Sequence, residues 1–160
     1  MKPTVPRAYR TLREKFPLTT VEIGYWGVEI APLGKVAEAQ ISYAVVSDGG
    51  EGDTSNWEKS WLVIGRETLD PVFIDTSQPE LPVFIAAHGM GIWKPVLIAP
   101  SIKAFFEILL RLAALAKGRE NPVALEENPI PKQAVQQFRK LLSAYLGRRA
   151  PSFWDDVFKN

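Results

Sequence analysis

Apolar residues between positions 61 and 99 fall into four short runs, which predict four consecutive strands. The runs span residues 61–65, 72–75, 82–87 and 93–99, and they are rich in β-branched and aromatic side chains. Short turns separate the runs, and Asp70-Pro71 marks the first of these turns. Because a parallel crossover needs about a dozen residues, connections this short predict an antiparallel meander.

The amino-terminal part of the chain predicts a helix followed by further strands. Residues 4–16 form a basic pattern with apolar positions at helical spacing, and Pro17 ends it. Part of residues 21–30 and all of residues 41–46 have the β-branched and aromatic content of strands. Residues 32–39 between them suit a helical turn.

Two longer amphipathic helices are predicted after residue 100. Ser101 has a hydroxyl suited to cap a helix that ends near Gly118, and residues 131–147 repeat apolar positions at helical spacing. Residues 152–158 begin with a serine followed by an acid three positions later, as in a capping box, and their aromatic side chains are expected to dock on the body. These elements predict an α+β fold with a mixed, largely antiparallel sheet of about five or six strands and flanking helices.

Length and charge narrow the class of protein. The 160 residues suit a single domain, residues 1–160, with a sizeable core. Nineteen Lys and Arg face eighteen Asp and Glu, which argues against a protein that grips nucleic-acid phosphates. The start of the chain lacks the apolar stretch of a signal peptide, and charges interrupt the longest apolar stretch, residues 102–115. We therefore expect a cytoplasmic protein that does not bind membranes.

Composition also removes most catalytic and metal chemistry. The chain has no cysteine and one histidine, His88, which excludes thiolate chemistry and a two-histidine metal site within one chain. No Gly-x-Ser-x-Gly elbow accompanies His88, so local hydrogen bonding that shapes a turn is favoured over catalysis. We expect no enzyme activity, no cofactor and no metal. A hydrolase centred on His88 and a nearby carboxylate is the least favoured alternative.

Residues 47–57 form an acidic, glycine-rich loop. Calcium binding is disfavoured because Gly50 occupies the third position of the loop pattern and Lys59 the twelfth, where oxygen ligands are needed. The favoured interpretation is a solvated connection, and the second is a contact surface for a basic partner. Trp57 adjoins this loop and is the best surface candidate among the five tryptophans. The basic residues of the first helix are expected to form a solvated face.

Several motifs between residues 61 and 106 occur in a characteristic order. They are Trp-Leu-Val-Ile-Gly at 61–65, Val-Phe-Ile-Asp at 72–75, Pro-Val-Phe at 82–84, a turn with His88-Gly89, and Ile-Ala-Pro-Ser-Ile-Lys-Ala-Phe-Phe at 98–106. This series resembles the SUKH superfamily, which includes a yeast cell-wall-assembly regulator and many bacterial toxin-immunity proteins. The family's usual Gly-Asp before the central strand is here Leu69-Asp70-Pro71, so only the acid matches.

The resemblance implies an α+β fold and a non-enzymatic binding role. The first hypothesis is a cytoplasmic immunity protein that binds and neutralises a bacterial toxin domain. The alternative is an intracellular regulatory or scaffold module that uses the same surface for another protein. Many toxin domains that cut nucleic acid are basic, so acidic residues are the expected contacts. The candidate partner-binding residues are Asp48, Glu51, Asp53, Trp57, Glu67 and Asp70.

Overall fold

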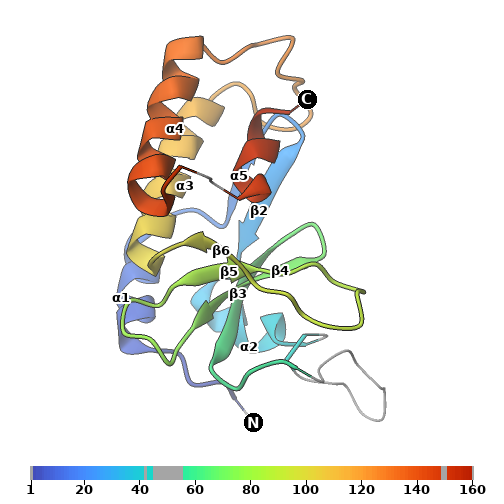
Figure 1. The fold of residues 1–160 in the computed structure, drawn as a ribbon, viewed down its shortest axis with the longest axis vertical. Helices are drawn as coiled ribbons and strands as arrows, with labels where there is room; N and C mark the ends of the chain where they lie inside the picture. The colour runs from blue at the N-terminus through green and yellow to red at the C-terminus, as the bar shows by residue number, and fades with distance from the viewer. Residues whose placement is uncertain (1, 42, 45–55, 149–150, 160) are drawn as a thin grey trace.

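The computed structural model describes residues 2–41, 43–44, 56–148 and 151–159, and its strands form one antiparallel sheet. Each strand pairs with the next one in the chain, so the sheet is a meander (Figure 1). The strands are β1 (Thr20–Ile23), β2 (Trp26–Ile30), β3 (Trp61–Glu67), β4 (Asp70–Asp75), β5 (Val83–Ile85) and β6 (Val96–Ala99). The six strands and their helices confirm the predicted α+β class.

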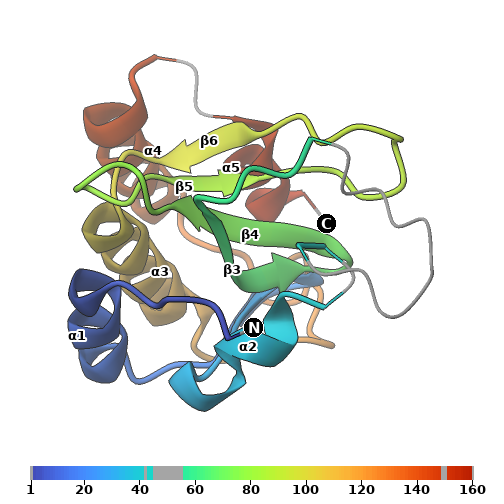
Figure 2. The same ribbon diagram turned by 90° about the horizontal axis from the view of Figure 1, so that it is seen from below.

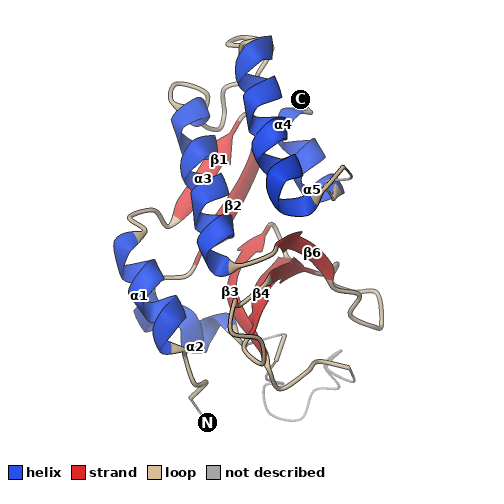
Figure 3. Ribbon diagram, turned by 60° about the vertical axis from the view of Figure 1, so that its left-hand side comes forward, coloured by secondary structure: helices blue, strands red, loops and turns tan. Residues whose placement is uncertain are grey.

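The longer helices lie together on one side of the sheet (Figures 2 and 3). These are α1 (Arg7–Lys15), α3 (Ile102–Ala116) and α4 (Lys132–Leu146). The shorter turns are the 3₁₀ helix η1 (Leu33–Lys35), α2 (Val36–Ala39), α5 (Ser152–Asp155) and the 3₁₀ helix η2 (Asp156–Phe158). In the part of the chain that is described, no helix combines the length and apolarity needed to cross a bilayer.

The main core lies between the sheet and these helices. Leu62, Ile64, Val72 and Ile74 point into it from β3 and β4, and α3 supplies eight buried side chains from the opposite side. Ser101 caps α3 as predicted, because its hydroxyl oxygen accepts a hydrogen bond of 3.0 Å from the Ala104 amide. The docked carboxyl-terminal segment closes the core, and its Trp154 is fully buried.

The other face of the sheet carries a smaller aromatic cluster. Phe73 of β4 is fully buried there and contacts the rings of Trp57, Trp61 and Phe84 at centroid distances of 5.0 to 5.8 Å. Val63, Ala86 and Trp93 complete the buried part of this cluster. Strand β4 is therefore buried on both faces, since Val72 and Ile74 point into the main core.

Two side-chain amides complete the backbone hydrogen bonding around the aromatic cluster. Gln40, after α2, donates to the Val63 carbonyl at 2.8 Å and accepts from the Val63 amide at 2.9 Å. Asn56 does the same for the carbonyl and amide of Trp93, both at 2.8 Å. Gln40 thus satisfies the backbone of β3, and Asn56 ties the residues before β3 to the β5–β6 connection.

Several strand predictions need correction. Residues 21–30 contain two strands that form a hairpin, β1 and β2, with a turn at Gly24 and Tyr25. Asp70 and Pro71 lie inside β4, and the turn before it is made by Thr68 and Leu69. The predicted strand 41–46 is not present at Ile41, which forms an isolated bridge, or at residues 43–44, which form a turn, and its other residues lie outside the described range.

Two expectations about side chains are also wrong. Ser152 forms no capping hydrogen bond, because the helix cap position falls on Pro151. Arg13 is not part of a solvated face, since only 7% of it is exposed. Its guanidinium donates hydrogen bonds to the carbonyls of Phe16, Ile30 and Ala31, at 2.8 to 3.3 Å. It joins α1 to the end of β2, while Arg7, Arg10 and Lys15 are exposed as expected.

Replacement of Gly65 by alanine is expected to destabilise the protein severely. A Cβ atom at Gly65 lies 2.1 Å from the Glu29 carbonyl oxygen, where backbone meets backbone and cannot yield. We expect the free energy of unfolding to fall by about 3 kcal/mol or more. Gly34→Ala is the matched control, because a Cβ there has nothing within 4 Å, and its effect is expected to stay within about 0.5 kcal/mol. Urea unfolding measures both, and equal effects contradict the prediction.

Candidate functional site

Two connections that are far apart in sequence lie at the same end of the sheet. In an antiparallel meander, alternate turns fall at the same end. The β3–β4 turn and the β5–β6 connection therefore lie near each other, with Trp26 of β2 and residues of α5 and η2 beside them. A hollow of about 380 Å³ opens between these segments, and we call it the acidic hollow. Its charged lining residues are Glu67, Asp70, Asp156 and Lys94.

The β3–β4 hairpin positions two of these carboxylates. Glu67 and Asp70 are paired residues at the last position of the ladder, with the Thr68-Leu69 turn between them. Thr68 adopts a positive φ of 53°, which closes the two-residue turn. Both carboxylates are half-buried, and both line the hollow. The strand ends place them there because the interiors of β3 and β4 are buried and do not accept charge.

Asp70 is joined to His88 of the β5–β6 connection. The Asp70 Oδ1 atom lies 2.6 Å from the His88 Nδ1 atom and accepts a bond of 2.9 Å from the His88 backbone amide. His88 thus shapes its turn, as expected, but through a partner eighteen residues away. Within the described residues, both hydrogen bonds of His88 end on Asp70. Among the described residues, no serine or threonine hydroxyl forms a hydrogen bond with the His88 ring.

The surroundings of Glu67 disfavour the ionised form of its carboxyl group. Burial raises its pKa above the usual glutamate value, and the nearby charges of Asp70 and Asp156 raise it further. A hydrogen bond from the Thr68 hydroxyl opposes this shift. Among the described residues, no basic side chain forms an ion pair with Glu67. The folded protein thus holds an uncompensated negative charge in this hollow.

Exposed apolar side chains border the acidic hollow. Met90 and Ile92 in the β5–β6 connection are 68% and 47% exposed, and Val96 at the start of β6 is 45% exposed. All three line the hollow. We call these three residues, Met90, Ile92 and Val96, the apolar rim. Apolar side chains grouped beside charges on a surface are typical of protein interaction sites.

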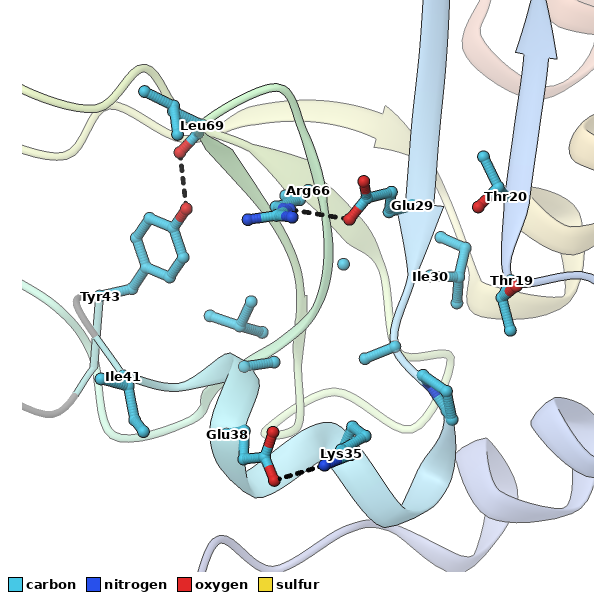
Figure 4. A pocket seen from close by; sticks show the side chains of 15 residues that line it. Thr19, Thr20, Glu29, Ile30, Lys35, Glu38, Ile41, Tyr43, Arg66 and Leu69 are labelled. Atoms are coloured by element: carbon cyan, nitrogen blue, oxygen red, sulfur yellow. Dashed lines mark hydrogen bonds and ion pairs between the residues drawn. The ribbon is translucent and has the colours of Figure 1, made fainter. Parts of the chain in front are cut away.

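A second and larger hollow, of about 560 Å³, lies between α2 and strands β2 and β3. In Figure 4 its charged side chains point toward one another rather than into open space. Arg66 donates to Glu29 at 2.8 Å, and Lys35 donates to Glu38 at 2.8 Å. The Tyr43 hydroxyl donates to the Leu69 carbonyl at 2.7 Å. Because these groups satisfy each other, this groove holds less unpaired chemistry than the acidic hollow does.

The predicted contact residues divide into three groups. Glu67 and Asp70 are brought together in the acidic hollow. Trp57 lies elsewhere, half-buried in the aromatic cluster, where its ring contacts Trp93 at a centroid distance of 5.4 Å. Trp57 therefore packs against the β5–β6 connection, which carries Met90 and Ile92 of the apolar rim. Asp48, Glu51 and Asp53 lie outside the described residues.

Sequence reasoning missed Asp156 and the apolar rim. The rim had a usable signal, because Met90 and Ile92 alternate with glycines in a short turn, where apolar side chains have little chance of burial. The meander itself also implies that this turn and the β3–β4 turn lie at the same end of the sheet. Asp156 offered no such signal, since its position depends on how the carboxyl-terminal segment docks.

Comparisons with known proteins do not identify the site. The described residues contain no group of three or more His, Cys, Asp or Glu side chains placed to hold a metal ion. No protein-family model matches this sequence, and comparisons with curated proteins and with solved structures gave no significant match. The resemblance to the SUKH superfamily therefore rests on the sequence motifs alone.

Replacement of Glu67 by glutamine is expected to stabilise the protein at neutral pH. A raised pKa means that the folded state penalises the ionised form, and this penalty is fully present only above the raised pKa. At pH 7 we expect a gain of at most about 0.5 kcal/mol, because solvent screens a half-exposed group. The gain is expected to vanish as the pH falls below the usual glutamate value, where both carboxyl forms are neutral.

Urea unfolding of wild type and Glu67→Gln at pH 7 and pH 3.5 measures this difference. Glu14→Gln is the matched control, since Glu14 is exposed on α1. A loss of stability at pH 7, or an equal gain at both pH values, contradicts the interpretation that burial and like charges strain Glu67.

Proposed function

We propose that this chain is a non-enzymatic immunity protein of SUKH type that binds a basic bacterial toxin domain and blocks it. The observation that carries the proposal is the joining of the acidic hollow to the apolar rim at one end of the sheet. Three carboxylates and three exposed apolar side chains share this surface. Such a surface suits a protein partner whose contact face is positively charged.

Physical reasons favour this combination for tight and selective binding. Apolar side chains in an interface supply binding free energy when they leave water. Charged groups beside them speed the encounter with an oppositely charged partner and reject like-charged ones. The rim is held by Asn56 and by the His88–Asp70 pair, so little ordering remains to be done on binding.

The cytoplasm is the proposed site of action. The chain contains no cysteine, so its folding depends on no disulfide and suits a reducing compartment. A toxin domain that reaches the cytoplasm meets its targets there, and an immunity protein has to act in the same place. The acting unit in this proposal is the single domain of residues 1–160.

The proposal is tested by growth rescue with a toxin encoded next to this gene. Expression of the isolated toxin domain is expected to arrest growth of a bacterial host, and co-expression of this chain is expected to restore it. The two purified proteins are expected to form a stoichiometric complex by sedimentation. An active-site mutant of the toxin domain serves as the control, since it arrests nothing yet still binds.

Two outcomes contradict the immunity proposal. One is a neighbouring toxin that binds this chain but retains full toxicity. The other is a gene with no toxin beside it whose product binds a non-toxic protein of its own cell, which is the result expected of a regulatory or scaffold module. Alanine replacements at Glu51 and Asp53 that leave the affinity unchanged exclude the 47–57 loop from the contact.

A further inference from the structure

The apolar rim and the acidic hollow form one groove, in which no basic side chain of the described residues forms an ion pair with Glu67. Asp70 is paired with His88, and Asp156 is paired with Lys159 at 2.8 Å. Lys94 also lines the groove, but it forms no ion pair with Glu67. Three carboxylates thus face a single lining amine. A cation that enters this groove is therefore attracted by the Glu67 carboxylate, which no basic side chain among the described residues neutralises.

The walls of the groove are apolar and partly aromatic. Ile85 and Val96 line it from the sheet, and Phe153 lines it from α5. Trp26 at the start of β2 backs Phe153 in an edge-to-face contact, with ring centroids 5.4 Å apart. Walls of this kind accept the methylene stem of a long cationic side chain, whose charged end then reaches the carboxylates.

Strand pairing is a poor route for a partner at this edge of the sheet. The buried indole of Trp154 donates a hydrogen bond of 2.8 Å to the Ile98 carbonyl of β6. Ile98 and Ala99 are buried, so only the first two residues of this strand are open. A stretch of two residues is too short for an added strand. A partner therefore docks here mainly through side chains.

We propose that the groove receives an arginine side chain of the partner, with its guanidinium on Glu67 and its stem against the apolar rim; the identity of that partner as a toxin domain rests on the function proposed above. Arginine fits better than lysine for two reasons. Its planar fork matches a carboxylate with two parallel hydrogen bonds. It is also more weakly hydrated than an ammonium group, so it loses less on entering a half-buried groove.

The test is an NMR titration of the full chain with N-acetylarginine amide. We expect saturable shifts confined to the groove, including the Trp26 indole and the amides of Glu67, Val96 and Phe153. N-acetylcitrulline amide is the matched probe, because it has nearly the same shape without the charge, and it is expected to produce no saturable shifts. Nα-acetyllysine amide, whose side-chain ammonium group is free, is expected to bind several-fold more weakly than the arginine probe.

Variants locate the binding to this groove. Glu67→Gln is expected to weaken the arginine probe about tenfold, which corresponds to the loss of one charge-assisted hydrogen bond. Glu29→Gln is the control, since Glu29 is an exposed carboxylate in the other hollow, and it is expected to leave the affinity unchanged. Affinity is also expected to fall as the pH is lowered through the raised pKa of Glu67.

Several outcomes overturn the inference. They are equal binding of the citrulline probe, lysine binding as tight as arginine, an unchanged affinity in Glu67→Gln, or shifts spread over the whole surface. Concentration-dependent groove shifts without any probe indicate a second copy of the chain as the occupant and also overturn it.

The failure of this inference is distinguishable from that of the proposed function. A toxin complex whose affinity is unchanged by Glu67→Gln removes the arginine contact but leaves immunity standing. Specific binding of the arginine probe without any rescue of growth removes the immunity function but leaves the groove as an arginine site.

Discussion

The burial of β4 on both faces is the constraint on which the rest of the structure depends. Val72 and Ile74 face the main core, while Phe73 faces the aromatic cluster, and all three are fully buried. A strand with no wet face accepts charge only at its ends, so Asp70 and Asp75 occupy its two terminal positions. The same constraint requires cover on both sides of the sheet. The helices supply it on one side, and loops with aromatic side chains supply it on the other.

The candidate site follows from this arrangement of strand ends. The meander collects alternate turns at one end of the sheet, and the carboxylates excluded from the strand interiors gather there. In the β5–β6 connection, Ala86 and Trp93 are buried in the aromatic cluster, but Met90 and Ile92 belong to neither core. They remain exposed beside the carboxylates. Charged and apolar side chains thus lie together at one end of the sheet, and they come from several elements rather than from one inserted loop.

Long-range polar contacts satisfy buried backbone groups at several places around the sheet. Gln40 hydrogen-bonds to both the amide and the carbonyl of Val63, and Asn56 does so with Trp93. The Trp154 indole donates a hydrogen bond to the Ile98 carbonyl. Arg13 does the same for three carbonyls at the end of β2 and its neighbours. Each contact satisfies a backbone group that burial has removed from water. Glu67 differs from these groups, since burial raises its pKa and no basic side chain among the described residues forms an ion pair with it.

Local sequence pattern alone predicted the α+β class, the meander of residues 61–99 and the cap at Ser101, because these depend on periodicity and on neighbours a few positions apart. The aromatic content of residues 152–158 also predicted that this segment docks on the body. It also marked Glu67 and Asp70 as candidate contacts. Tertiary structure decided that residues 21–30 fold back as a hairpin, that Arg13 is buried, and that Trp57 supports a loop from behind. It also brought Asp156 to the hollow. These outcomes depend on contacts between residues distant in the chain, whose free energies no local pattern records.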